Sequence, residues 1–254
     1  MKGVLLLMVW MASLALAMDF PGEFVQNPGG SLALAGLPGY RSSPARYLGE
    51  GEIAGFGLAY ARVPEASLQV AGAAGEMGLG HFRIAFLGSY AEMDTLYRQV
   101  YSEVETAVAH SWIVGGLGYG VSVDILPGQE SWTCNRYKAG LALMKKPLSI
   151  SGLGSLVNQG SFFHVDYGAS LRFDGARFGA FVEYDGESFD VGNYLKFEHL
   201  SVISAYRFPE FAVSVSLVLS IGNWAVSGAY GSAYPIWDWF GFTVAKSVRK
   251  KTIL

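Results

Sequence analysis

The sequence predicts an all-β protein, a transmembrane antiparallel β-barrel of 12 to 14 strands with an N-terminal hatch-like segment. Hydrophobic residues make up 51% of the 254 residues and charged residues only 15%, too few to cover a soluble protein of this length. No run of 18 apolar residues follows the first 17 residues, so no spanning helix is expected. Instead, short segments alternate bulky apolar residues with small ones, which is typical of strands that face lipid on one side.

The first 17 residues, 1–17, are predicted to be a secretory signal peptide. Lys2 supplies the positive start, an apolar stretch follows, and Ala15-Leu16-Ala17 is a small-residue cleavage site. No cysteine follows directly after Ala17, so a lipoprotein anchor is not expected, and a retained N-terminal anchor is the alternative. An exported chain of this kind is expected in the outer membrane of a bacterial cell, in contact with its lipid.

Residues 18–50 are predicted to form an irregular hatch or plug, and residues 51–254 are predicted to form the barrel. The first segment holds four of the nine prolines and has no clear period. Beyond residue 50, runs of about 8 to 14 residues are separated by turn signals, which is the spacing expected of tilted membrane strands.

The clearest predicted strand is 162–173, where nearly every second residue is bulky and apolar. One face carries Phe163, Val165, Tyr167, Ala169, Leu171 and Phe173, and the other carries Phe162, His164, Asp166, Gly168, Ser170 and Arg172. The same period of two occurs in 211–222, 116–125 and 55–61. Bulky faces opposite small faces predict strands that lie between lipid and a crowded interior.

Turn signals between these runs predict hairpins. They are Val63-Pro64-Glu65, Lys145-Lys146-Pro147, Asp174-Gly175, Phe208-Pro209-Glu210 and Gly222-Asn223. Thirteen runs can be counted along the chain, and single-chain bacterial barrels have even strand numbers. We therefore expect 12 or 14 strands.

A soluble β-sandwich is the main alternative fold, because its strands alternate as well. Its outer face should carry Lys, Glu and Thr, whereas the second face here consists of Gly, Ala and Ser. Aromatic residues near the predicted strand ends also favour a barrel, since they suit the girdles at membrane interfaces. These residues are Tyr90, Trp112, Trp132, Tyr184, Tyr206, Trp224, Trp237 and Trp239.

Three short elements resemble the PorV/PorQ group of outer-membrane proteins, which is similar to the FadL long-chain fatty acid transporters. Asn27-Pro28-Gly29-Gly30 resembles the group's Asn-Pro-Ala-Gly element, with Gly29 in place of Ala. The run Phe86–Asp94 resembles its early strand, and Gly152–Gly160 resembles its mid-barrel strand closing on Asn-x-Gly. The order of elements matches over most of residues 20–248. Two departures are the shorter chain, for which twelve strands fit more easily, and a C-terminus without the usual aromatic residue.

What the resemblance implies is a barrel partly filled by an N-terminal hatch that includes Asn27, Pro28, Gly29 and Gly30. Such a barrel transports hydrophobic small molecules or serves as a component of type IX secretion, with secretion-system proteins as partners. A structural or adhesive barrel with a closed lumen, whose loops bind a protein partner, is the alternative. No enzyme activity and no cofactor are expected.

Charged residues on the predicted inner faces are the candidate lumen or ligand residues. They are Arg136, Lys138, His164, Asp166, Arg172, Glu183 and Asp185. His164 and Asp166 lie two residues apart and therefore on one strand face, with Arg172 further along. These three residues are candidates for a hydrogen-bonded network or a ligand site, and a plain charged wall is the alternative.

A basic cluster and an acidic cluster are expected to pair inside the barrel. Arg136 and Lys138 share a face with Cys134, and Glu183 shares a face with Asp185. Unpaired ions away from bulk water are unfavourable. We therefore expect the two clusters to meet across the lumen and to plug or gate it.

Other function classes have little support in the sequence. A formal net charge of −3 argues against nucleic-acid binding. The four histidines lie on separate segments, so no metal site is expected, and the single cysteine has no disulfide partner within the chain. The glycine-rich run 116–120 lacks the context of a nucleotide-binding loop. Ser161, His164 and Asp166 lack the nucleophile elbow of a hydrolase.

Three polar stretches are expected to be extracellular loops. Residues 97–105 carry several charges and have some helical character, while 126–131 and 185–192 carry Gly and acidic residues. Docking of a partner on one of these loops is the alternative interpretation.

Overall fold

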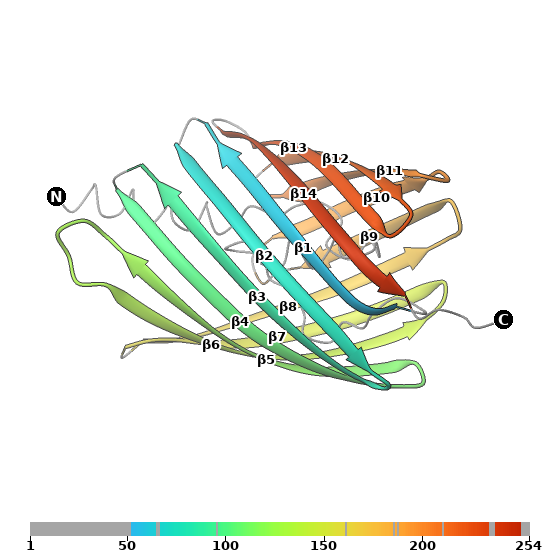
Figure 1. Ribbon diagram of the computed structural model, residues 1–254, viewed down its shortest axis with the longest axis horizontal. Coiled ribbons are helices and arrows are strands. Elements are labelled where there is room, and N and C mark those ends of the chain that lie inside the picture. Colours follow the sequence, from blue (N-terminus) through green and yellow to red (C-terminus); the bar gives the residue numbers. More distant parts are fainter. Residues whose placement is uncertain are drawn as a thin grey trace.

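The computed structural model of the chain is a closed β-barrel of fourteen antiparallel strands (Figure 1). It describes residues 52–64, 67–94, 96–160, 162–184, 186, 188–209, 211–233 and 237–249. The predicted signal peptide and hatch, including Asn27 to Gly30, lie outside the described residues, as does Asp185. The all-β barrel and its even strand number are confirmed. No helix in the described part of the chain is long and apolar enough to cross a membrane.

Each strand pairs with the next one along the chain, and the first strand pairs with the last. The strands are β1 (Glu52–Val63), β2 (Leu68–Leu79), β3 (Phe82–Met93), β4 (Tyr97–His110), β5 (Ile113–Ile125), β6 (Trp132–Lys145), β7 (Leu148–Gln159), β8 (Phe162–Asp174), β9 (Phe178–Tyr184), β10 (Phe189–Lys196), β11 (Leu200–Phe208), β12 (Ala212–Ile221), β13 (Trp224–Ala233) and β14 (Trp237–Arg249). Pairing of β1 with β14 closes the barrel.

Bulky apolar side chains cover the outer surface, as their period of two predicted. On β8, Phe163, Val165 and Tyr167 are 66%, 64% and 58% exposed, whereas Ser170 and Arg172 on the opposite face are 9% and 7% exposed. A soluble sandwich would bury the bulky face between two sheets, so that alternative is wrong. An apolar exterior around a closed barrel is what a hydrocarbon environment requires.

The strand missing from the thirteen predicted runs is β11. The turn before it, 197–199, contains neither Gly nor Pro, and the Phe197 amide donates a hydrogen bond to the Leu200 carbonyl at 2.7 Å. Because no turn signal separates them in the sequence, β10 and β11 were counted as one run of alternating residues. The expectation that twelve strands fit more easily is wrong, because β9 to β13 have only 7 to 10 residues each.

One predicted loop is wrong and another is too long. Residues 97–105 belong to β4, a strand of 14 residues in which the two acidic residues lie inside the barrel, whereas Arg98 lies on the outer face. Glu103 is 2% exposed and Glu105 is 0% exposed, while Val104 between them is 43% exposed. Since β10 begins at Phe189, the predicted loop 185–192 ends before that residue. The predicted connection 126–131 is confirmed between β5 and β6.

The two ends of the barrel differ in their connections. At the end where β1 starts and β14 finishes, each hairpin is joined by two or three residues, and we call this the short-turn end. At the opposite end, the long-loop end, connections reach six residues in 126–131. Short periplasmic turns and longer exterior loops are typical of outer-membrane barrels.

Aromatic residues lie near both ends, as a girdle requires. Tyr90, Trp112 and Trp224 are 40%, 48% and 43% exposed. Trp132 does not fit the girdle, because the register places it on the inner face, two residues from Cys134.

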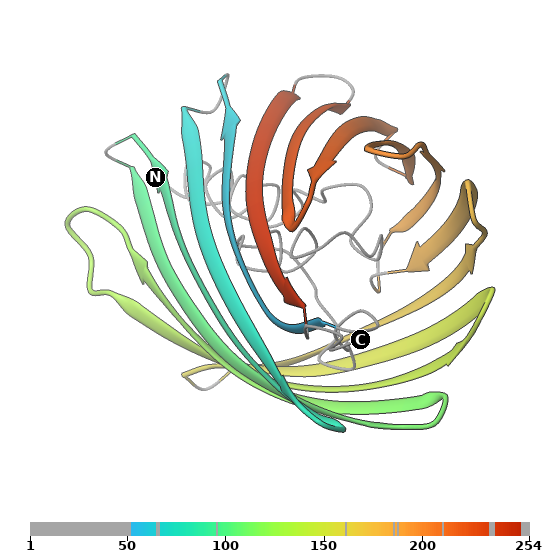
Figure 2. The same cartoon turned by 45° about the vertical axis from the view of Figure 1, so that its right-hand side comes forward.

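Two walls of different strand length face each other (Figure 2). The long-strand wall consists of β2 to β8, with 12 to 14 residues each. The short-strand wall consists of β9 to β13. Both walls contribute charged residues to the interior.

Candidate functional site

The candidate site is the inner wall of the barrel, where carboxylates and cationic side chains form ion pairs. Five carboxylates take part, those of Glu76, Glu103, Glu105, Asp174 and Asp190. Five cations pair with them, those of Arg83, Lys138, Arg172, Lys196 and Arg207. The pairs fall into the Glu103 cluster (Glu76, Arg83, Glu103, Glu105 and Lys138), the Tyr194 cluster (Arg172, Asp174, Tyr194 and Lys196) and the Asp190–Arg207 pair.

The Glu103 cluster runs along the long-strand wall from β2 to β6. Arg83 Nε lies 2.7 Å from Glu76 Oε2, and its Nη2 lies 3.4 Å from Glu105 Oε2. Lys138 Nζ lies 2.7 Å from Glu103 Oε2. Arg83 and Glu105 are 0% exposed, so these charges depend on one another for stabilisation.

Glycine on β5 explains how Lys138 reaches Glu103. Lys138 is on β6 and Glu103 on β4, so β5 lies between them. A Cβ atom at Gly118 would lie 3.1 Å from Glu103 Oε1 and 3.4 Å from Lys138 Cβ, and one at Gly120 would lie 2.7 Å from the Tyr101 hydroxyl. Glycine therefore leaves the space in which side chains from both neighbouring strands cross β5.

The Tyr194 cluster joins β8 and β10 near the short-turn end. Arg172 Nη2 lies 3.1 Å from Asp174 Oδ2, and Lys196 Nζ lies 2.9 Å from Asp174 Oδ1. The Tyr194 hydroxyl also donates a hydrogen bond to Asp174. Both cations lie over the Tyr194 ring, at 5.4 Å for Arg172 and 4.7 Å for Lys196. One carboxylate and one ring thus hold two cations.

Aromatic rings lie against glycine where β9 and β10 pair. Tyr194 on β10 is opposite Gly179 on β9, and Phe181 on β9 is opposite Gly192 on β10. A Cβ atom at either glycine would overlap the facing ring. The rings are 0% and 4% exposed and belong to an apolar cluster with Ile203 and Val218.

A bidentate pair lies closer to the long-loop end. Arg207 Nη2 and Nε donate to the two carboxylate oxygens of Asp190 at 2.7 and 3.0 Å. This planar arrangement is the strong form of a guanidinium–carboxylate contact. Glu183 on β9 is the register partner of Asp190, so a predicted candidate residue borders this pair.

The predicted pair of His164 and Asp166 does form. His164 Nε2 lies 2.7 Å from Asp166 Oδ1, and the side chain of His164 is 70% exposed. Ser155 donates to Asp166 Oδ2 at 3.5 Å, so its hydroxyl contacts the carboxylate and not the imidazole. Arg172 does not join this network, because it belongs to the Tyr194 cluster.

The basic cluster of Arg136 and Lys138 was expected to meet Glu183 and Asp185 across the lumen, but Lys138 pairs elsewhere, and Asp185 lies outside the described residues. Lys138 pairs sideways within the long-strand wall, with Glu103 two strands away, because a strand neighbour across a glycine is closer than the opposite wall. Arg136 lies on the same inner face, next to Cys134.

Most members of the three groups were absent from the predicted site. Glu103 and Glu105 are two residues apart within a strand, the same spacing that identified His164 and Asp166. This signal was obscured because 97–105 was expected to be a loop. Arg83, Asp190 and Arg207 have no comparable partner two residues away, so only the register reveals their pairs.

The charges in the three groups of the inner wall neutralise one another. The three groups contain as many carboxylates as cations, and apolar residues such as Phe181 and Ile203 lie beside them. In the described part of the chain, no three or more His, Cys, Asp or Glu residues are grouped so that they could hold a metal ion. The wall can therefore line a passage without carrying a strong field of one sign.

Comparisons with known proteins bear on the fold. No protein-family model matches the chain, and no curated protein matches it. The toluene transporter TodX of Pseudomonas putida has a similar structure, with 7% identity and a TM-score of 0.57 over 81% of this chain and 92% of TodX. Omp33, an outer membrane protein of Acinetobacter baumannii, has 11% identity and a TM-score of 0.52 over 78% of this chain and 98% of Omp33.

A weaker match is to a porin. A triple mutant of the Rhodopseudomonas blastica porin has 7% identity and a TM-score of 0.48, over 77% of this chain and 99% of the porin. At these identities the similarity to TodX and Omp33 shows the fold alone, which is a closed β-barrel.

Proposed function

We propose that this chain is a bacterial outer-membrane barrel that transports small, mainly apolar molecules. An apolar exterior supports the membrane location. The structural similarity to a toluene transporter and the sequence resemblance to the FadL transporters both favour apolar solutes.

The observation that carries this proposal is the neutralised inner wall. A wide, water-filled pore exposes its lining charges to water, whereas Arg83, Glu105 and Lys138 are 0%, 0% and 4% exposed. Charges that are buried and paired do not attract ions of either sign. On the short-strand wall, apolar Phe181 and Ile203 lie in one cluster with Tyr194, at 4% and 2% exposure. We therefore expect low ion conductance together with saturable passage of apolar solutes.

Purified protein in lipid vesicles tests the transport role. Labelled toluene and a labelled long-chain fatty acid are offered outside, and ion conductance is measured separately in planar bilayers. Ser151 faces inward on β7 and Ile150 outward, so Ser151→Trp should slow solute uptake and Ile150→Trp should not. Uptake that does not saturate, or that both variants slow equally, argues against transport through the barrel.

A separate experiment tests whether the predicted hatch fills the barrel. Deletion of residues 20–45 should raise conductance in planar bilayers if this segment fills the barrel. An unchanged conductance counts against a hatch.

A second candidate function is a component of type IX secretion, supported by the resemblance to the PorV/PorQ group. The exposed six-residue loop 126–131 at the long-loop end offers a surface for a protein partner. Recovery of secretion proteins in a pull-down, together with no saturable solute binding, favours this role or a closed structural barrel. Replacement of 126–131 by a short glycine turn should abolish that recovery.

A further inference from the structure

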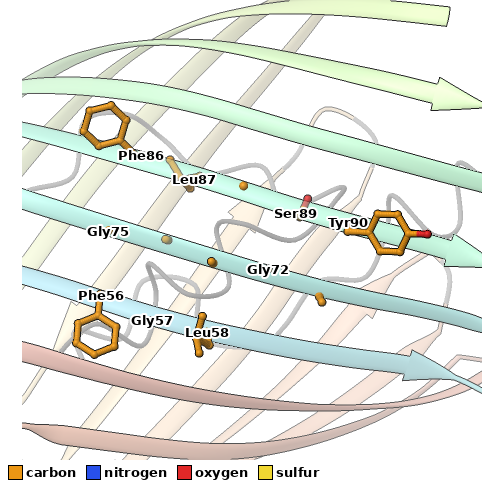
Figure 3. A pocket seen from close by; sticks show the side chains of 13 residues that line it. Phe56, Gly57, Leu58, Gly72, Gly75, Phe86, Leu87, Ser89 and Tyr90 are labelled. Atoms are coloured by element: carbon orange, nitrogen blue, oxygen red, sulfur yellow. The ribbon is translucent and has the colours of Figure 1, made fainter. Parts of the chain in front are cut away.

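A groove runs along the outer surface of the barrel over β1, β2 and β3 (Figure 3). Its volume is about 700 Å³. Phe56 and Phe86 lie on either side of β2, and Leu58 and Tyr90 continue these two ridges. The floor consists of the small residues of β2, Ala71, Ala73 and Gly75, together with Gly88 of β3. The groove is therefore apolar and open toward the surroundings of the barrel.

A polar rim closes the groove toward the long-loop end. The register aligns Arg62, Gln69, Glu92 and Arg98 in one row across β1 to β4. The Arg98 and Glu92 side chains are 54% and 37% exposed, with a separation of 3.4 Å. Two guanidinium groups and one carboxylate give this row an excess of positive charge.

Tyrosine hydroxyls mark the boundary between the groove and the rim. The Tyr60 hydroxyl donates to Gln69 Oε1 at 3.1 Å, and the Tyr90 hydroxyl donates to Glu92 Oε2 at 3.0 Å. Both rings lie on the apolar side while their hydroxyls reach the polar row. Tyrosine takes this position at the interface between hydrocarbon and headgroups.

The width of the groove limits its occupant. Its ridges stand on β1 and β3, which are two strand spacings or about 9.6 Å apart before their side chains are counted. A helix is about 10 to 12 Å across and does not fit between them. A second barrel would present the bulky outward residues of several adjacent strands, like those of β8, and a surface of that breadth cannot fill the groove along its length. A single hydrocarbon chain does fit.

We propose that this groove binds one acyl chain of a phosphate-bearing membrane lipid, with the headgroup held at the rim by Arg62 and Arg98. The apolar groove matches the chain, and the guanidinium groups match the phosphate in charge and in hydrogen-bond geometry. The rim lies at the long-loop end, so the lipid belongs to the exterior leaflet. This site requires the barrel to be in a membrane but does not depend on transport.

Native mass spectrometry of the full chain tests the site. The probes are dimyristoyl phosphatidylglycerol and dimyristoylglycerol, which share their chains but not the phosphate. Wild-type protein should retain one phosphatidylglycerol under conditions that remove other lipid. Ala73→Phe fills the floor and should lower that retention at least about tenfold. Arg62→Gln with Arg98→Gln should lower it roughly three- to tenfold and leave dimyristoylglycerol unaffected.

Matched variants keep the experiment decisive. Ala169→Phe makes the same change on the lipid-facing side of β8, away from the groove, and should leave retention unchanged. Gly88→Val is a second filling variant, because a Cβ there lies at an ordinary 3.6 Å from the Tyr101 carbonyl. Heat-resistant mobility on a detergent gel checks the fold of each variant.

Three results would overturn the proposal. The first is that the Ala73→Phe variant retains phosphatidylglycerol as well as the wild type does. The second is that Ala169→Phe loses as much lipid as Ala73→Phe does. The third is that the wild type forms a dimer which Ala73→Phe dissociates, while lipid retention stays constant. The last result would identify the occupant as a second copy of the chain.

Discussion

The long-strand wall and the short-strand wall both fill the space over a glycine, but with different side chains. On the long-strand wall, Lys138 and Glu103 meet over Gly118, between two strands that are not neighbours. On the short-strand wall, the Tyr194 ring lies on Gly179 of the adjacent strand. At these two glycines, the long-strand wall therefore joins strands by charge and the short-strand wall by ring packing.

The two kinds of contact are sensitive to different substitutions. An ion pair away from bulk water depends on both partners, since the loss of one leaves a charge without compensation. A ring against a glycine depends on the absence of one carbon atom. Substitutions of one residue should thus damage the two walls by different mechanisms and to different degrees.

Removal of the Lys138 charge should have the largest effect. Lys138→Met keeps most of the side-chain volume but leaves the Glu103 carboxylate without this partner, which should lower the free energy of unfolding by about 3 to 5 kcal/mol. Urea unfolding in phospholipid vesicles measures the change. The double variant Lys138→Met with Glu103→Gln should recover most of the loss. A single variant as stable as the wild type would show that the pair does not join β4 and β6.

Closure of the space at Gly179 should have an intermediate effect. Gly179→Ala adds a Cβ where the Tyr194 ring lies, and overpacking of this kind lowers the free energy of unfolding by about 1 to 3 kcal/mol. Gly154→Ala is the control, because nothing lies within 4 Å of a Cβ at that strand position. Equal urea midpoints for the two variants would contradict the ring-on-glycine packing.

Loss of an outer ion pair should have the smallest effect and sharpens the contrast with the inner wall. Arg98 and Glu92 lie on the outer face and are more than one-third exposed. Arg98→Gln should change the free energy of unfolding by only about 0.2 to 1 kcal/mol. If Arg98→Gln lowered the free energy of unfolding as much as Lys138→Met does, the stabilisation from an ion pair would not depend on whether the pair lies inside or outside the barrel.

The barrel itself could be predicted because its physical cause is local. A side chain that faces lipid must be apolar, and the next one must fit the interior, so the pattern of Phe163 to Phe173 is visible without a structure. The count of thirteen runs missed one strand where this local signal stopped, at a turn without Gly or Pro between β10 and β11.

The inner pairs could be predicted only in part. His164 and Asp166 share a strand, so their spacing alone brings them together. Lys138 and Glu103 are 35 residues apart, and their contact depends on the register of three strands and on Gly118 between them. Sequence spacing carries no information about such a contact.

The seam between β1 and β14 has a consequence for biogenesis. These strands come from opposite ends of the barrel segment, yet they match over the length of β1 from Glu52 to Arg62. A ribosome delivers β1 first, so its free edge must wait unpaired until thirteen further strands have emerged. During that delay the edge is a template for association with other chains, which makes a chaperone or an insertion machine that shields it a requirement for efficient maturation.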